Sequence, residues 1–442
     1  MTRGALAAEV LAARGSGETG GDPAARGFLL ELEEELAPEI ESIRERSSME
    51  PAWSARGELR LLARSRGRGA LRPIALGGLA VRLSRHLSWH QLAEVDARGG
   101  DDPDFIGAEW KRGITGDFRL AYAAFRFAGV RLTAGRRAIA WGTGDAGTLI
   151  LQGGSPPLDQ IGIDAARGVF SAHAFVASLD DLPIDGTDVS ARRWLSGHRL
   201  SVRLGDRLRV AVSETVLYGG EDRGLDWAHA NPLLVYYAVD WNRRGDDNVL
   251  WGADAYLRAH PLLDLYGEFL ADDFQYDRET EPNQIAFLVG GRAKGPARFA
   301  SVFVDAEYAR VNNWVYGHEM PWNRYVNGNA LLGHPIGPDA DRLLVRLLLR
   351  RGQNLELLAQ HEHRREGEGS IDDPRDAAVP NGTGFLTGKV TTRDLPALEL
   401  RFHPQAGARF HARIERSVDD DWIVSGGALL RFAAGRPFTG GD

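Results

Sequence analysis

Hydrophobic and polar residues alternate at every second position along most of this chain. Between residues 254 and 270 one side of the pattern is apolar and the other is mostly charged or polar; the apolar side reads Ala255, Leu257, Ala259, Pro261, Leu263, Leu265, Gly267 and Phe269. Neighbouring residues of a strand point to opposite faces. The pattern therefore predicts one long strand over 254–270, and it returns over 208–218, 300–311 and 398–415.

Residues 398–415 show the alternation most sharply. The apolar set is Leu398, Leu400, Phe402, Ala408, Phe410, Ala412 and Ile414, and the polar set is Glu399, Arg401, His403, Arg409, His411, Arg413 and Glu415. Two classes of protein use long strands of this kind. A soluble sandwich or barrel turns the apolar face inward, whereas an outer-membrane barrel turns it toward lipid, around a polar lumen.

Composition narrows the choice only in part. The chain has 442 residues and no cysteine, so it can form neither disulfides nor thiolate metal sites. Its net charge is -8 and its basic residues are scattered, which argues against nucleic acid as a partner. No run of about eighteen apolar residues predicts a transmembrane helix, but membrane barrels carry their hydrophobicity in every second residue. Residues 1–21 lack the apolar core of a signal peptide, so we expect either that the signal has been removed or that the protein is not exported.

The chain divides into a short helical part and a long strand-rich part. Residues 1–23 are expected to form a flexible tail, and residues 24–56 a helical segment in which apolar residues recur at helical spacing over 26–46, interrupted by Pro38. Residues 57–435 are expected to form a barrel of about eighteen strands, followed by a tail over 436–442. Ser425–Phe432 alternates and ends on an aromatic residue, like the terminal strand by which outer-membrane barrels are recognised for assembly.

Short turns alternate with long polar loops, as in outer-membrane barrels. Short turns are expected at 98–101, 204–207, 243–246, 351–354 and 405–407. Long loops are expected near 99–117, 180–192, 219–230, 271–284, 312–342 and 364–388.

Signatures of catalysis and of bound cofactors are missing from the sequence. There is no GxSxG and no GxxxxGK[ST] motif. His318-Glu319 begins like a zinc-protease helix, but Trp322 stands where the second histidine is required. His361 and His363 could share one strand face but have no third metal ligand. We therefore expect no enzyme activity, no cofactor and no metal.

Three glycine-rich and aromatic segments resemble the Wzi-type capsule assembly family of outer-membrane barrels. The resemblance is carried by Gly135-Arg136 followed by Trp141-Gly142-Thr143-Gly144, then by Asn231-Pro232, Tyr266-Gly267 and Asp272-Asp273, and finally by the run Leu332–Asp341. A WGPG form is common in the family, and Thr143 replaces its proline here. The resemblance implies an eighteen-stranded barrel with small periplasmic helices that acts, without catalysis, in the assembly or retention of surface polysaccharide in the bacterial outer membrane.

Part of the same segments has side chains suited to carbohydrate, because sugars offer hydroxyls to carboxylates and C–H faces to aromatic rings. The candidate polysaccharide-binding residues are Trp314, Tyr316, Trp322, Tyr325, His334, Asp339, Asp341, Asp272 and Asp273. In extended backbone Asp339 and Asp341 would share a face. Several alternatives stay open: Trp and Tyr also form interface girdles, Asp339 could cap a turn, and Asp272-Asp273 with Tyr276 could bind calcium or pair with lumen arginines.

Charged strand residues are expected to line the lumen. They are Arg126, Arg131, Arg136, Arg203, Arg209, Arg346 and Arg413, together with His173, His198, Arg199 and Glu214. A porin-like diffusion channel would have the same strand pattern and is the main alternative function; an outer-membrane enzyme and a soluble all-β protein are weaker ones. The expected partners are surface polysaccharide, outer-membrane lipid and, during biogenesis, the barrel assembly machinery.

Overall fold

The computed structural model describes most of the strand-rich part of the chain. It covers residues 52–64, 71–96, 110–111, 113–153, 156–273, 283–297, 300–352, 354–373, 385–405 and 407–435. The expected N-terminal tail, residues 24–51 of the expected helical segment, Tyr276 and the C-terminal tail lie outside these residues. Residues 52–56, which were expected to belong to the helical segment, instead begin the first strand of the barrel. None of the helices in the described ranges has the length and hydropathy needed to cross a bilayer.

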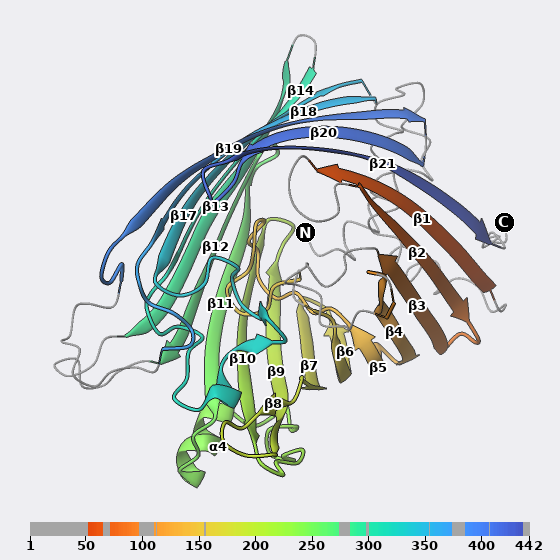
Figure 1. Ribbon diagram of the computed structural model, residues 1–442. Coiled ribbons are helices and arrows are strands. Elements are labelled where there is room, and N and C mark those ends of the chain that lie inside the picture. Colours follow the sequence, from red (N-terminus) through yellow and green to blue (C-terminus); the bar gives the residue numbers. More distant parts are fainter. Residues whose placement is uncertain are drawn as a thin grey trace.

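The chain folds into a closed antiparallel β-barrel (Figure 1). Its sheet holds nineteen strands, one of which, β8, has only two residues, so eighteen long strands make the wall. Each long strand pairs with the one before it, and β1 pairs with β21 to close the ring. The expected eighteen-stranded barrel is therefore confirmed.

The long strands have the following bounds: β1 Ala52–Arg64, β2 Leu71–Arg82, β3 Leu87–Asp96, β4 Thr115–Phe127, β5 Val130–Arg137, β6 Leu158–Arg167, β7 Phe170–Ser178, β9 Ser190–Leu204, β10 Leu208–Gly220, β11 Asn248–His260, β12 Leu263–Asp273, β13 Gln284–Ala297, β14 Ala300–Val311, β17 Ala340–Arg351, β18 Leu355–Glu366, β19 Thr391–Gln405, β20 Ala408–Arg416 and β21 Trp422–Gly435. The short elements lie in loops: β8 Leu182–Pro183, α4 Tyr236–Arg243, η1 Pro321–Asn323, β15 Val326–Asn327 and β16 Ala330–Leu331.

The two ends of the barrel differ in their connections. Short turns lie at the end where β1 begins and β21 stops, and include 83–86, 128–129, 168–169, 205–207 and 261–262. Long connections lie at the other end, here called the loop end, and include 138–157, 179–189, 221–247, 312–339 and 367–390. The loops expected near 180–192, 219–230, 312–342 and 364–388 are confirmed there, whereas those expected near 99–117 and 271–284 lie largely outside the described residues. The connection 138–157 is one that the sequence did not reveal.

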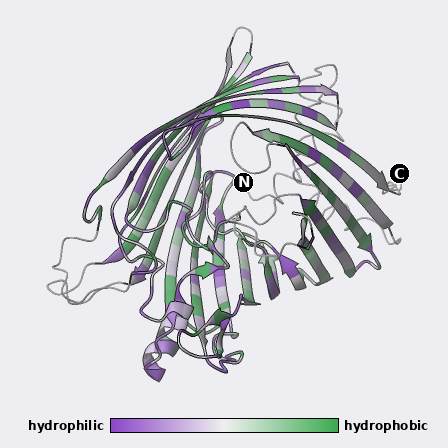
Figure 2. Cartoon of the chain, in the orientation of Figure 1, coloured by the Kyte–Doolittle hydropathy of each residue, from purple (hydrophilic) through white to green (hydrophobic). Residues whose placement is uncertain are grey.

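Hydrophobic and hydrophilic residues alternate in bands along the strands, as Figure 2 shows. The exposed large apolar side chains of these strands lie on the outer face of the barrel. Leu400 and Phe410 are each 46% exposed on the outer face. Arg401, on the opposite face, bonds Glu399 inside the barrel. The outward orientation predicted for the apolar set of 398–415 is confirmed.

The predicted single strand over 254–270 is wrong. The chain turns at Pro261 and Leu262, and β11 and β12 form a hairpin in which Leu257 pairs with Leu265. A two-residue turn preserves the alternation, because paired residues of the two strands share a face. The pattern therefore continued across the turn without a visible break.

Three of the residues expected in the lumen point outward instead. His198 and Glu214 are paired across β9 and β10 in the same row as the exposed Leu200 and Val212. Arg136 lies on the outer face of β5 with Leu132 and bonds Asp159 of β6 at 2.9 Å. Strand periodicity alone shows that His198 and Arg199, being adjacent, cannot share a face.

The seam between β1 and β21 joins the two ends of the sheet. Eleven residue pairs form it, from Ser54 with Gly435 to Arg64 with Ser425. Phe432 lies opposite Gly57, where a Cβ atom would come within 2.1 Å of the phenylalanine ring. On the inner face Arg431 donates to Glu58 at 2.6 Å. The aromatic residue of the predicted terminal strand thus packs on a glycine of the first strand.

Candidate functional site

Two loops fold into the loop end of the barrel and fill it. The inner loop, residues 138–157, connects β5 and β6, and the capping loop, residues 312–339, connects β14 and β17. Gln152 joins them, because its backbone N–H donates to Leu332 O at 2.8 Å and its side-chain amide donates to Leu331 O at 2.9 Å. Their apolar residues form one buried core with the inner face of the wall, which includes Trp141, Leu149, Leu151, Val315, Tyr316 and Leu332.

A carboxylate on the wall holds the turn of the inner loop. Glu268 of β12 accepts the backbone N–H groups of Thr143 at 2.5 Å, Gly144 at 2.6 Å and Leu149 at 2.7 Å. Gly142 has a φ of 138°, and a Cβ there would come within 2.4 Å of the Glu268 carboxylate. The glycines of Trp141-Gly142-Thr143-Gly144 are thus required for the backbone to wrap closely around a buried anion.

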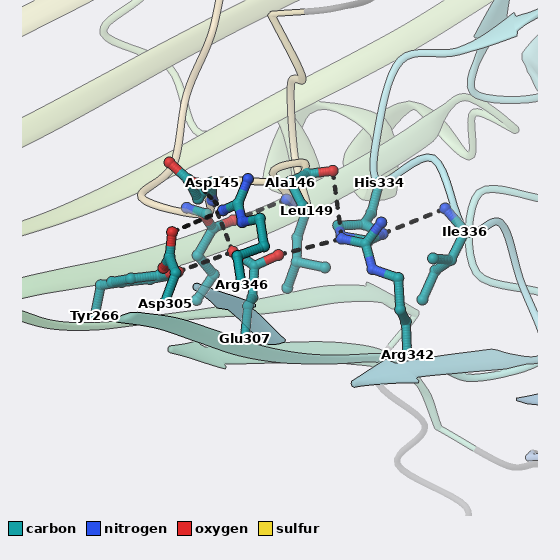
Figure 3. A network of polar contacts seen from close by, with 12 residues as sticks. Asp145, Ala146, Leu149, Tyr266, Asp305, Glu307, His334, Ile336, Arg342 and Arg346 are labelled. Atoms are coloured by element: carbon teal, nitrogen blue, oxygen red, sulfur yellow. Dashed lines mark hydrogen bonds and ion pairs between the residues drawn. The ribbon is translucent and has the colours of Figure 1, made fainter. Parts of the chain in front are cut away.

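A second set of charges fixes the tip of the inner loop (Figure 3). Asp145 bonds Arg292 at 2.6 Å and also pairs with Arg346, both on the wall. The Asp145 backbone N–H donates to Glu307 at 2.7 Å, and Glu307 in turn pairs with Arg342 at 3.2 Å. The tip of the loop is therefore held by two arginines, from β13 and β17, and by a carboxylate from β14.

Tyr316 connects the capping loop to the inner loop. Its hydroxyl donates to Leu149 O at 2.6 Å and accepts the backbone N–H of His334 at 3.1 Å. Its backbone N–H donates to Asp272 at 2.5 Å, so this candidate carboxylate binds the loop itself. His334 is fully buried, and its Nε2 lies 3.3 Å from Arg342 Nη2. Figure 3 shows this contact.

Most of the candidate binding residues are enclosed by protein. Tyr316, Tyr325 and His334 are fully buried, and Trp314 is 6% exposed. Tyr325 stacks on Tyr316 with ring centroids 5.9 Å apart and donates to Thr215 at 3.1 Å. These side chains support the capping loop from within. The side chain of Asp273 lies outside the described residues.

Asp339 and Asp341 bind different partners. Asp339 accepts the backbone N–H of Gly369 at 2.9 Å and the Thr387 hydroxyl at 2.6 Å, so it fastens the capping loop to the connection 367–390. Asp341 accepts the Tyr308 hydroxyl at 2.9 Å and pairs with Arg365. The two carboxylates do not share the expected extended backbone, because Asp339 has a φ of 55°.

Trp322 is the aromatic candidate that remains partly exposed. It lies in η1, and its carbonyl accepts a hydrogen bond from Arg193 at 2.7 Å. Arg193 is 1% exposed and also donates to Arg324 O and Val326 O, each at 2.8 Å. It thus holds the outer part of the capping loop, a role that nothing in the sequence signalled.

A basic cavity of about 1040 Å³ lies beneath the inner loop, toward the short turns. Its walls include Arg126, Arg131, Arg199 and Arg209, which confirms their predicted place in the lumen. Within the described residues no group of three His, Asp or Glu side chains is arranged to hold a metal ion. His361 and His363 do share a strand face, where both contact Asp394.

The comparison with known families decides the assignment. The family model described as "Capsule assembly protein Wzi" matches residues 79–424, most of the chain. This chain belongs to the Wzi capsule assembly family. Two of the segments that carried the predicted resemblance lie in the loops that fill this Wzi-family barrel. The glycine motif around Gly142 is in the inner loop, and most of the run Leu332–Asp341 is in the capping loop.

Solved structures agree on the fold. One is Wzi of Escherichia coli, described as an outer-membrane protein involved in group 1 capsule assembly and a carbohydrate-binding β-barrel. It has a TM-score of 0.62 and 15% identity, over 90% of this chain and 87% of that one. Another is OccAB4 of Acinetobacter baumannii, with a TM-score of 0.50 and 8% identity, over 89% of this chain and all of that one. No curated protein sequence matches this chain.

Proposed function

We propose that this Wzi-family barrel resides in the outer membrane and binds surface polysaccharide at its loop end, without catalysis. The observation that carries the proposal is the filling of the barrel by the inner and capping loops, whose residues share one buried core with the wall. A diffusion channel needs a continuous aqueous path, and such a core opposes it. A barrel filled in this way offers its outer loop surface as the place for a large ligand.

We place the sugar contact on the outer surface of the capping loop. Trp322 provides an aromatic face for sugar C–H groups and is partly exposed. Beside it in sequence, Arg324 pairs with the exposed Asp372 at 2.7 Å, so donors and acceptors for hydroxyls lie nearby. Aromatic rings and planar charged groups are the side chains that recognise polar ligands with apolar faces.

The other candidate residues support this surface. Tyr316, Tyr325 and Asp339 fix the capping loop through hydrogen bonds to the wall, the inner loop and the connection 367–390. Their part in binding is to hold Trp322 in place rather than to touch the glycan. Trp314, His334, Asp272 and Asp341 support the loop and its surroundings in the same way.

Binding of capsular polysaccharide to the purified barrel tests the proposal. Trp322→Ala should weaken binding by about tenfold or more, the loss of one good aromatic contact. Trp227→Ala, at an exposed tryptophan on the connection 221–247, is the matched control and should bind like wild type. Equal binding by all three proteins, each migrating as a folded barrel on an unheated gel, would remove the capping loop from the binding surface.

Planar-bilayer recording separates this function from that of a porin. The filled loop end predicts that the wild-type protein shows no large, steady openings. Stable openings of porin size would favour diffusion instead. As an outer-membrane barrel the protein also needs lipid around its apolar outer face and the barrel assembly machinery during insertion, and both belong to the proposal.

A further inference from the structure

A polar pair lies on the outer face of the barrel at the loop-end border of its apolar belt. His198 Nε2 of β9 is 3.1 Å from Glu214 Oε2 of β10. In the next row toward the short turns, Leu200 and Val212 are 47% and 58% exposed. Polar groups facing lipid are costly unless they are covered or paired. This pair therefore requires a covering structure.

The connection 221–247 provides that cover by folding back along the outside of the wall. Glu214 accepts the backbone N–H groups of Tyr236 at 2.8 Å and Tyr237 at 2.9 Å, at the start of α4. It also accepts the indole N–H of Trp251 at 2.9 Å. With these partners Glu214 is only 5% exposed, although it lies on the outer face of a strand.

A second hydrophobic core lies beneath this connection, outside the barrel. It consists of Val216, Tyr218 and Val249 from the wall and Tyr236 from α4, with Trp194 packed against it. This core is separate from the one formed by the two loops inside. The connection 221–247 is therefore docked on the outer wall of β9, β10 and β11 as part of the folded structure.

The outward pair between Arg136 and Asp159 provides a contrast. It lies on β5 and β6, and its side chains remain 27% and 55% exposed. The outward pair on β5 and β6 is thus less covered than the pair on β9 and β10.

The outer surface of the covering connection is itself apolar. Trp227, Leu233 and Trp241 are 80%, 89% and 70% exposed, and Val235 is 49% exposed. Exposed groups of this size are unfavourable in water when they are clustered. Tryptophan and tyrosine are, however, enriched where membrane hydrocarbon meets the headgroups.

This surface continues the lipid-facing surface of the wall. Trp251, 49% exposed on the outer face of β11, contacts the ring of Tyr237 at 5.9 Å between centroids. Tyr237 in turn stacks on Trp241 at 6.1 Å. Arg244, exposed directly after α4, supplies a positive charge suited to lipid phosphate groups.

We propose that residues 227–241 form a membrane anchor that lies in the outer leaflet, with Leu233 and Trp241 inserted at the boundary of acyl chains and headgroups. The occupant of this surface is lipid. The anchor extends the lipid-facing surface over a sector where the bare strands would present a carboxylate and an imidazole. One sector of the barrel is thereby held to the leaflet by a loop as well as by strands.

Site-directed spin labelling tests the anchor directly, because the chain has no native cysteine. Labels would be placed singly through Leu233→Cys and Trp241→Cys in the full chain, reconstituted in lipid vesicles. Leu400→Cys is the lipid-facing control, and Asp188→Cys, at an exposed position next to β9, is the aqueous control. A difference in gel migration between the unheated and the heated protein confirms that each variant is folded.

The measured quantities are the collision rates of each spin label with oxygen, which concentrates in lipid, and with a water-soluble nickel chelate. We expect the labels at 233 and 241 to follow the label at 400, with oxygen collisions several-fold above nickel collisions. Nickel accessibility like that at 188 would overturn the anchor and make the connection an aqueous loop. Protection from both reagents, with dipolar broadening between labels, would also overturn it, because a second copy of the chain would then cover the surface.

Discussion

The carboxylate of Glu268 accepts the backbone N–H of Gly144 at 2.6 Å, although the two residues are 124 positions apart in the chain. This bond ties the inner loop to the middle of the wall. Since Thr143 and Leu149 donate to the same carboxylate, one side chain binds three backbone N–H groups of the inner loop.

Glu268→Gln should therefore loosen the inner loop. An uncharged amide accepts these three N–H groups more weakly, and its own NH₂ group competes for space, with a cost of about 1–3 kcal/mol. We expect brief openings in planar bilayers that wild type does not show. Glu356→Gln, a wall carboxylate paired with Arg350 near the short turns, is the control. If both variants stay equally silent, Glu268 does not hold the loop in place.

Tyr316→Phe should lower the stability of the filled barrel. It removes the hydroxyl that bonds Leu149 O and the His334 N–H, two buried groups, at a cost of about 1–3 kcal/mol. The measurement is the temperature at which the folded form is lost on gels. Tyr237→Phe, at a partly exposed ring on the outer connection, should leave that temperature within about a degree of wild type. A similar shift for both variants would contradict the role assigned to the Tyr316 hydroxyl.

Arginine on the lipid-facing side should damage assembly. Leu400→Arg and Phe410→Arg place a charge on the outer face, at about 2–4 kcal/mol each if they lie near the membrane midplane. His411→Leu, on the inner face of β20, should be tolerated much better. The readout is the yield of folded barrel in outer membranes. Equal loss from inner-face and outer-face substitutions would contradict the orientation of β19 and β20.

Asp247 predicts how the outer connection responds to pH. Burial raises the pKa of Asp247 to about 6, against the opposing charge of Arg223 at 2.9 Å. The folded form then binds more protons than the unfolded form between about pH 4 and 6, so this carboxyl favours folding at low pH and weakens it as pH rises through 6. The effect is at most about 3 kcal/mol.

Asp247→Asn should remove this contribution. Hydrogen exchange of residues 221–247, corrected for intrinsic rates, should be slower in the variant than in wild type at pH 7.5, and the difference should shrink at pH 5. Burial lowers the pKa of the neighbouring His229, which therefore acts in the opposite direction, and His229→Gln isolates that effect. A difference that stays constant with pH would show that Asp247 does not titrate in this range.

The fold was largely predictable because the strands of a barrel wall show a local sequence pattern, the alternation of apolar and polar residues. The outward orientation of Leu400 and Phe410, the eighteen strands and most long loops follow from two-residue alternation and turn residues. The turn at Pro261 was missed because it leaves the alternation in phase. Residues 138–157 were not recognised as a loop because a loop that folds inward is rich in apolar residues, as strands are.

The site was less predictable because burial of a loop depends on what folds over it. The glycines around Gly142 and the run from Leu332 to Asp341 were correctly singled out, but the sequence does not show that Tyr316 and His334 are enclosed. His198 and Glu214 point outward through strand alternation, and the connection 221–247 covers them from outside. These two residues were predicted to line the lumen because they are charged or polar. The alternation of faces along β9 and β10 would have placed them on the outer face instead.

Because the seam joins the first and the last strand, the barrel can close only when all of its strands are present. Arg431 bonds Glu58 although the two residues are 373 positions apart, because β1 pairs with β21. The first strand therefore gains its second neighbour only when the last strand has formed. Until then both margins of the sheet offer unpaired backbone groups to any other strand. A chain truncated before β21 therefore cannot close the barrel, and its open sheet has two unpaired edges that can pair with other chains.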